Sequence, residues 1–215
     1  MGRDALTANT TASNNTAVGY ASLAANTTGA ENTAVGTSAL GANTTASYNV
    51  AIGQGAGDAI TTGNYNTAIG RSALTTLTTN AANTAVGGTA LSANTAANNT
   101  AVGYAALAAN TTGTQNTAVG ALAADAVTVG EKNVAFGYVA LSSDTQGSKS
   151  TALGYAALNA QNFTSATDTF NTAIGFEAGG AVTTGVQNTL IGGLAGDAIT
   201  TGSGNAAVGY NALGA

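Results

Sequence analysis

Cysteine, histidine, proline and tryptophan are all absent from this chain of 215 residues. Without cysteine there is no disulfide to staple the fold and no thiol nucleophile. Without histidine the chain lacks the usual general base and the commonest metal ligand. The only cations are scattered at Arg3, Arg71, Lys132 and Lys149. No nucleophile and base pair is evident, so we expect no enzyme activity, no cofactor and no metal site.

Charged residues are scarce, at 6% of the chain against roughly 25% in a typical globular domain. Nine acidic residues outnumber four basic ones, which gives a net charge of −5. Such a surface repels nucleic acid phosphates and anionic lipid headgroups, so we expect neither as a partner. No apolar run approaches the length of a membrane-spanning helix, so we expect no membrane insertion.

What the chain does have is a glycine that recurs about every seventeen residues. The spacing is seventeen except for sixteen between Gly87 and Gly103 and twenty-one between Gly154 and Gly175. Such self-similarity is typical of a solenoid, so we expect residues 1–215 to form one uninterrupted repeat array. Both ends fall inside a unit, from which we expect the chain to be a fragment of a longer protein. The repeat glycines are Gly2, Gly19, Gly36, Gly53, Gly70, Gly87, Gly103, Gly120, Gly137, Gly154, Gly175, Gly192 and Gly209.

Other positions keep their residue type relative to each repeat glycine. The residue just before it is always large and apolar, and we call these positions the aliphatic column. The residue two before is Ala in every complete unit except that of Leu190, which defines the alanine column. The residue four before is Asn except at Ser150, which defines the asparagine column. The residue four after is usually Leu, which defines the leucine column, and its exceptions are Gly57, Ala124, Gly179 and Gly196.

These columns predict an all-β fold, a parallel β-solenoid with one coil per unit. Seventeen residues are too few for a helix pair. Helix-forming stretches such as 104–109 are also too short, because Gly, Asn and Thr on either side limit them to less than two helical turns. We therefore expect about twelve stacked coils of one unit each. In such a stack the asparagine column forms a ladder of side-chain amides, or else repeats because a turn requires Asn.

Neighbouring residues of a strand face opposite sides, so the aliphatic and alanine columns cannot share one core. We expect the aliphatic and leucine columns to fill the lumen of the coil. The alanine column, which holds almost nothing larger, is then expected to pack closely against another copy of the chain around a symmetry axis.

The unit NTAVGYAALAANTTG at residues 99–113, and its variant AGDAITTG at residues 56–63 and 195–202, resemble repeats of bacteriophage tail fibres and bacterial surface fibre proteins. More distantly they resemble the head repeats of trimeric autotransporter adhesins. Essentially the whole chain shares the pattern. The resemblance implies a homotrimer of left-handed parallel β-rolls, located on a cell surface, on a virion or otherwise outside the cell. It implies a structural segment of a fibre, a rigid shaft or an adhesive head in attachment to a host receptor or glycan.

Aromatic residues are the candidates for surface recognition. Tyr104, Tyr138 and Tyr155 directly follow repeat glycines, at positions that we call the corner column and that also hold Tyr20, Tyr210 and Phe176. Rings in such a column suit stacking against sugars, or else cover the coil corner or pack between copies. The four extra residues between Gly154 and Gly175 bring Phe163 and Phe170 into a region that is elsewhere small and polar. That insertion predicts a recognition loop, or else a loop that covers an irregular coil.

The acidic and glycine-rich motifs indicate neither a calcium site nor a phosphate-binding loop. Asp58, Asp125 and Asp197 share the slot five after the glycine, and we interpret them as solvated corner residues. The chain has no calcium-binding repeat, and the crowded glycines at residues 53–57 lack the lysine of a phosphate loop.

Two other functions compete with a fibre segment. Rows of Thr would suit an ice-binding solenoid, but the Thr pairs eight and nine residues after the glycine are adjacent, so their side chains point to opposite faces. A self-assembling filament subunit, joined end to end, is the third possibility.

Overall fold

The computed structural model describes residues 2–214, which contain strands, turns and loops and no helix. They fall into two compact units, Met1–Ala105 and Ala106–Ala215. The predicted parallel β-solenoid is confirmed in each unit. The expectation of one uninterrupted array stays a prediction, and Met1 of the aliphatic column lies outside the described residues.

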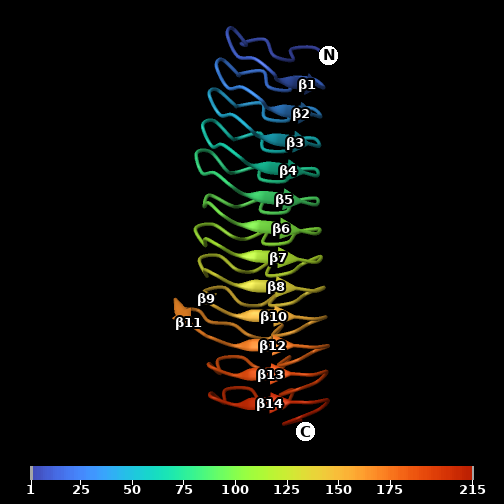
Figure 1. Ribbon diagram of the computed structural model, residues 1–215, viewed down its shortest axis with the longest axis vertical. Helices are drawn as coiled ribbons and strands as arrows, with labels where there is room; N and C mark the ends of the chain where they lie inside the picture. Colours follow the sequence, from blue (N-terminus) through green and yellow to red (C-terminus); the bar gives the residue numbers. More distant parts are fainter. Residues whose placement is uncertain (1, 215) are drawn as a thin grey trace. The chain divides into compact units, whose positions relative to one another are not determined.

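Each complete coil contributes one short strand that ends just before its repeat glycine. In the first unit six strands pair in chain order (Figure 1): β1 (Thr16–Val18), β2 (Thr33–Val35), β3 (Val50–Ile52), β4 (Thr67–Ile69), β5 (Thr84–Val86) and β6 (Thr100–Val102). In the second unit the stack consists of β7 (Thr117–Val119), β8 (Val134–Phe136), β10 (Thr151–Leu153), β12 (Thr172–Ile174), β13 (Thr189–Ile191) and β14 (Ala206–Val208).

The pairing is parallel and in register, so that equivalent residues lie above one another. Ala17 pairs with Ala34, and Ala152 pairs with Ala173 across the insertion. The insertion leaves this register unchanged because it is accommodated at the opposite end of the coil. There β9 (Gly147–Ser148) and β11 (Thr167–Asp168) form a separate parallel pair, seen on the left in Figure 1.

The lumen is lined by the alanine column, which corrects our assignment of the two strand faces. In each strand of both stacks the central residue is buried and the flanking ones are half-buried or exposed, as in β8, where Ala135 is buried and Phe136 is 52% exposed. Leu40, Leu74 and their equivalents fill the rest of the lumen, as expected for the leucine column. The centre of the strand lies close to the leucine column, so only a small side chain fits between them.

Leu190, the one large residue in the alanine column, shows why Ala is the rule there. It is fully buried and is accommodated by the glycines that occupy the leucine column in its own coil (Gly196) and in the preceding coil (Gly179). A Cβ on Gly196 would lie 2.7 Å from Cδ2 of Leu190, and one on Gly179 would lie 2.8 Å from its Cδ1. A bulky residue is therefore tolerated in the alanine column where the leucine column next to it holds glycine.

The asparagine column is buried and stacked along the coils, and its recurring hydrogen bonds join side chain to backbone, so that the stacked ladder and a backbone requirement for Asn apply together. The N–H of Asn32 donates to Oδ1 of Asn15 (2.9 Å), and Nδ2 of Asn32 donates to the carbonyl of Ala46 (2.8 Å). Asn49 repeats both bonds one coil further on. Each side chain thus satisfies two backbone groups of the next coil: the side chain of Asn32 accepts from the N–H of Asn49 and donates to the carbonyl of Ala46.

The repeat glycine occupies a corner that has no room for a side chain wherever another coil follows. From Gly19 to Gly209 the φ angle of these glycines lies between 125° and 142°, where an L-residue is strained. A Cβ on Gly87 would also lie 2.2 Å from the carbonyl oxygen of Gly103 in the next coil. These two constraints explain why glycine recurs at this position.

Candidate interaction surface

The outer face of each stack carries the aliphatic column and, two residues earlier, a column that is mostly Thr. None of these positions holds a charged residue. Val18, Ile52 and Val102 in the first unit and Leu153 in the second are each 36–49% exposed, so each stack carries an apolar row along its strands. The hydroxyls of Thr33, Thr67 and Thr84 beside that row make no hydrogen bond within the described chain.

The Thr column eight residues after the glycine differs from that of the outer face. There the hydroxyl donates to the carbonyl of the equivalent residue in the next coil, as from Thr27 to Thr44 (3.0 Å) and from Thr128 to Thr145 (2.9 Å). These hydroxyls therefore stabilise the stack, whereas those of the outer face remain available to water or to a partner.

The structure brings two of the three candidate tyrosines of the corner column together. Tyr138 and Tyr155 stack with ring centroids 5.7 Å apart, and Phe176 continues the stack at 5.1 Å from Tyr155. The planes differ by 20° and 8°, so the ring faces are turned toward one another. A sugar approaching this stack would meet mainly ring edges. Tyr104 belongs to the first unit and is exposed.

The two phenylalanines of the insertion differ in exposure. Phe163 is only 8% exposed, so the prediction of a surface aromatic at this position is wrong. Phe170 is 51% exposed, with the ammonium of Lys149 lying 5.0 Å from its ring centroid. Lys149 also pairs with Asp168, so the insertion is held to the preceding coil by a cation–π contact and an ion pair.

A buried polar cluster beneath the insertion escaped the sequence analysis. Asp144 is fully buried and accepts hydrogen bonds from the backbone N–H groups of Gly147 (3.0 Å) and Phe163 (3.1 Å) and from Nε2 of Gln161 (2.5 Å). Gln161 in turn accepts from Asn171 (2.8 Å). Asp144 occupies a position that holds Asn in several other coils. This replacement of Asn by Asp next to the insertion was the sequence signal that could have revealed the cluster.

The three carboxylates in the slot five after the glycine are partly buried, which corrects their interpretation as solvated residues. In Asp58, Asp125 and Asp197 one oxygen, Oδ1, is wholly enclosed and has no hydrogen-bond partner in the described chain. Desolvation by burial raises the pKa of Asp58 and of Asp125, although backbone hydrogen bonds oppose it.

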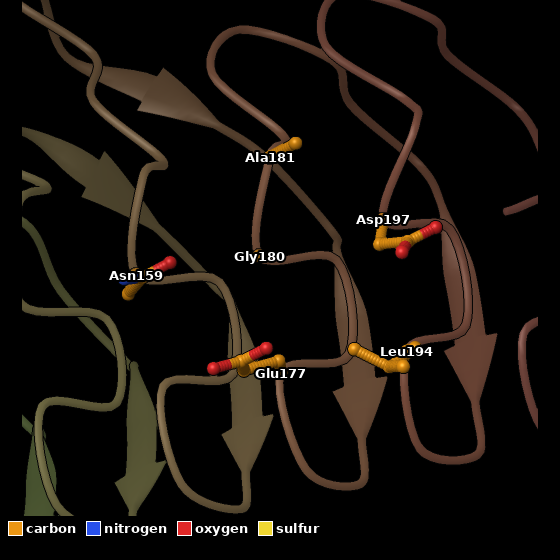
Figure 2. Close-up of a pocket in the computed structure, with 6 residues that line it drawn as sticks. All are labelled: Asn159, Glu177, Gly180, Ala181, Leu194 and Asp197. Atoms are coloured by element: carbon orange, nitrogen blue, oxygen red, sulfur yellow. The ribbon is translucent and has the colours of Figure 1, made fainter. Parts of the chain in front are cut away.

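A hollow of about 260 Å³ lies in the second unit, where Gly180 leaves a gap between Asn159 and Asp197 (Figure 2). In Figure 2 the Asn159 side chain points toward Gly180, whereas the Asp197 carboxylate is directed away from Glu177. No group of three metal-ligating side chains occurs among residues 2–214. The lining residues are Asn159, Glu177, Gly180, Ala181, Leu194 and Asp197.

Comparison with protein-family models, with curated proteins and with solved structures finds no match to this chain. Residues 2–214 include no helix long and apolar enough to span a membrane.

Proposed function

We propose that the chain is a structural repeat segment of a homotrimeric fibre, outside the cell or on a virion, that serves as a rigid shaft or adhesive head in surface attachment. The observation that carries this proposal is the apolar row on the outer face of the strands. A row of exposed Val, Ile, Leu and Phe side chains, repeated once per coil, is a surface that soluble proteins usually cover with a partner.

A second copy of the same chain suits that row best. Its aliphatic column has the same spacing, one side chain per strand, so two or three copies lying parallel bring equivalent rows together along their length. The row carries no charge, so copies with a net charge of −5 can approach there without charges meeting directly. In such an assembly the insertion, with Phe170 exposed, remains for contact with a host receptor or glycan.

The solution mass tests this proposal. A homotrimer has three times the chain mass of 20.4 kDa, about 61 kDa. Multi-angle light scattering at micromolar concentration should give that value, together with a folded circular dichroism spectrum. A folded monomer of 20.4 kDa would contradict the proposal. Electron microscopy of the same sample separates a discrete trimer from the filament alternative.

Ice binding remains a second candidate because of the outer face itself. The adjacent Thr pairs that argue against ice binding lie eight and nine residues after the glycine, away from the outer face. The outer face itself carries a row of unpaired Thr hydroxyls beside an aliphatic row on one sheet. Thermal hysteresis of the purified chain tests this function. Freezing and melting points that coincide at millimolar concentration would exclude it.

A further inference from the structure

The apolar rows of the two units differ, and that of the second unit carries larger side chains over β8, β10 and β12. The aliphatic column holds Phe136 and Leu153 there, and the corner column holds Tyr138, Tyr155 and Phe176. We call these five side chains the aromatic patch. All are 40–54% exposed. In the first unit the corner column mostly carries Thr, Gln, Arg or Gly instead.

We propose that the aromatic patch is the principal contact between copies of the chain, which rests on the trimer proposed above. Energetic hot spots of protein interfaces are few and are enriched in large side chains that pack against equivalent groups. The three stacked rings are already ordered by one another, so burying them costs less conformational entropy than burying flexible side chains.

The size and charge of the patch fit a second copy. A fully buried aromatic side chain covers about 150–250 Å², so the half-exposed rings of Phe136, Tyr138, Tyr155 and Phe176 together offer about 400 Å². A standard interface needs about 800 Å² per partner. The patch thus supplies about half of one, and the aliphatic column that runs on from it can supply the rest. No member of the patch is charged, so identical patches can meet.

The test compares three stacked rings with three isolated rings of the same column. The patch variant carries Tyr138→Thr, Tyr155→Thr and Phe176→Thr, and the control variant carries Tyr20→Thr, Tyr104→Thr and Tyr210→Thr. Thr37 already occupies this column, so both variants are compatible with the coil. Analytical ultracentrifugation over a dilution series gives the dissociation constant of the assembly. We expect the patch variant to raise it about tenfold more than the control variant does.

Equal weakening by the two variants would overturn this inference and leave the trimer standing. A wild-type chain that is monomeric throughout the series would overturn both. If the patch variant fails to fold, cross-linking decides instead, since the native chain has no cysteine. With a short bis-maleimide, Leu153→Cys should give cross-linked copies and Thr112→Cys should not. Cross-linking that favours Thr112→Cys would contradict the patch.

Discussion

At the scale of the residue, two glycines that are neighbours in the chain obey different constraints. Gly87 has a φ of 137° and faces the backbone of Gly103, whereas a Cβ on Gly88 would meet only the Tyr104 ring, at an ordinary 3.6 Å. Backbone conformation and close approach together restrict the first position to glycine. Only the first belongs to the repeat.

We expect Gly87→Val to lower the free energy of unfolding by about 3 kcal/mol or more, because strain and overpacking add. Gly88→Val should cost less than about 1 kcal/mol. Thermal and urea unfolding of the two variants provide the measurement. Similar losses for both would show that the backbone constraint at the corner has been misjudged.

Burial of Asp58 predicts a dependence of stability on pH. Its pKa is raised from the usual 3.8 by desolvation, so the folded chain binds this proton more tightly than the unfolded chain does. The favourable contribution of the protonated form is complete below pH 3.8 and is lost as the pH rises through the folded-state pKa.

Asp58→Asn removes this ionisation, and Asn159 already occupies the same slot of another coil. The variant should therefore be more stable than the native chain at pH 7, and the difference should shrink as the pH falls toward 4. Urea unfolding at a series of pH values measures it. A difference that widens on acidification would mean that the ionised carboxylate is stabilised.

At the scale of the coil, a large apolar side chain fills the core from one of two positions, the leucine column or the position three residues after it. Most coils have Leu in the leucine column and a polar residue, commonly Asn, three residues later. Four coils instead have Gly or Ala in the leucine column and Ile or Val three residues later. A Cβ on Gly57 would lie 3.0 Å from Cδ1 of Ile60, so Ile60 fills the space that a Leu would take. The exchange also leaves Oδ1 of Asn43, in the preceding coil, without a partner.

This exchange predicts strong coupling between Gly57→Leu and Ile60→Asn. The first change alone overpacks the coil, and the second leaves a cavity and a buried amide. Together they restore the common arrangement and give Asn43 a neighbouring amide. A double-mutant cycle of unfolding free energies should show about 1–3 kcal/mol of favourable coupling. Additive losses would mean that the two positions do not share the space.

Several features of the coil could be predicted from the sequence, and others could not. The period, the strand before each glycine, the glycine corner and the asparagine ladder were all predictable, because each rests on one residue type repeated at one position. The faces were assigned the wrong way round because residue size was taken to indicate burial. In this coil the opposite holds, since the lumen admits Ala from the strand while the larger Val and Ile remain outside.

The candidate surface was less predictable than the fold. Tyr138 and Tyr155 were identified because aromatic residues recur in one column, but stacking with Phe176 depends on three successive coils and on ring geometry. Phe163 was misassigned because an insertion gives no pattern of burial. The left-handed backbone at Leu40, with a φ of 50°, also had only an indirect signal, the presence of Gly in the same column elsewhere.

At the scale of the molecule, each strand of a stack contacts only the strands of adjacent coils. Stability in such a structure is a sum of local contributions. We expect Gly36→Val to speed hydrogen exchange in β1–β4 of the first unit while β10, β12 and β13 of the second unit keep their protection. Mass spectrometry of exchanged peptides measures this. A uniform rise in exchange across both units would show that the chain unfolds as one cooperative body.

The hydrogen bonds between coils, described above for Asn32 and Asn49, also determine how the protein responds to force. They join one coil to the next, so tension applied along the stack loads one coil boundary at a time. Releasing one coil frees seventeen residues, roughly 58 Å of extended chain, in place of about 4.8 Å of stack. The chain lengthens about twelvefold where it yields. A fibre built in this way would absorb a pull by unwinding single coils at its loaded end while the coils behind them stay folded.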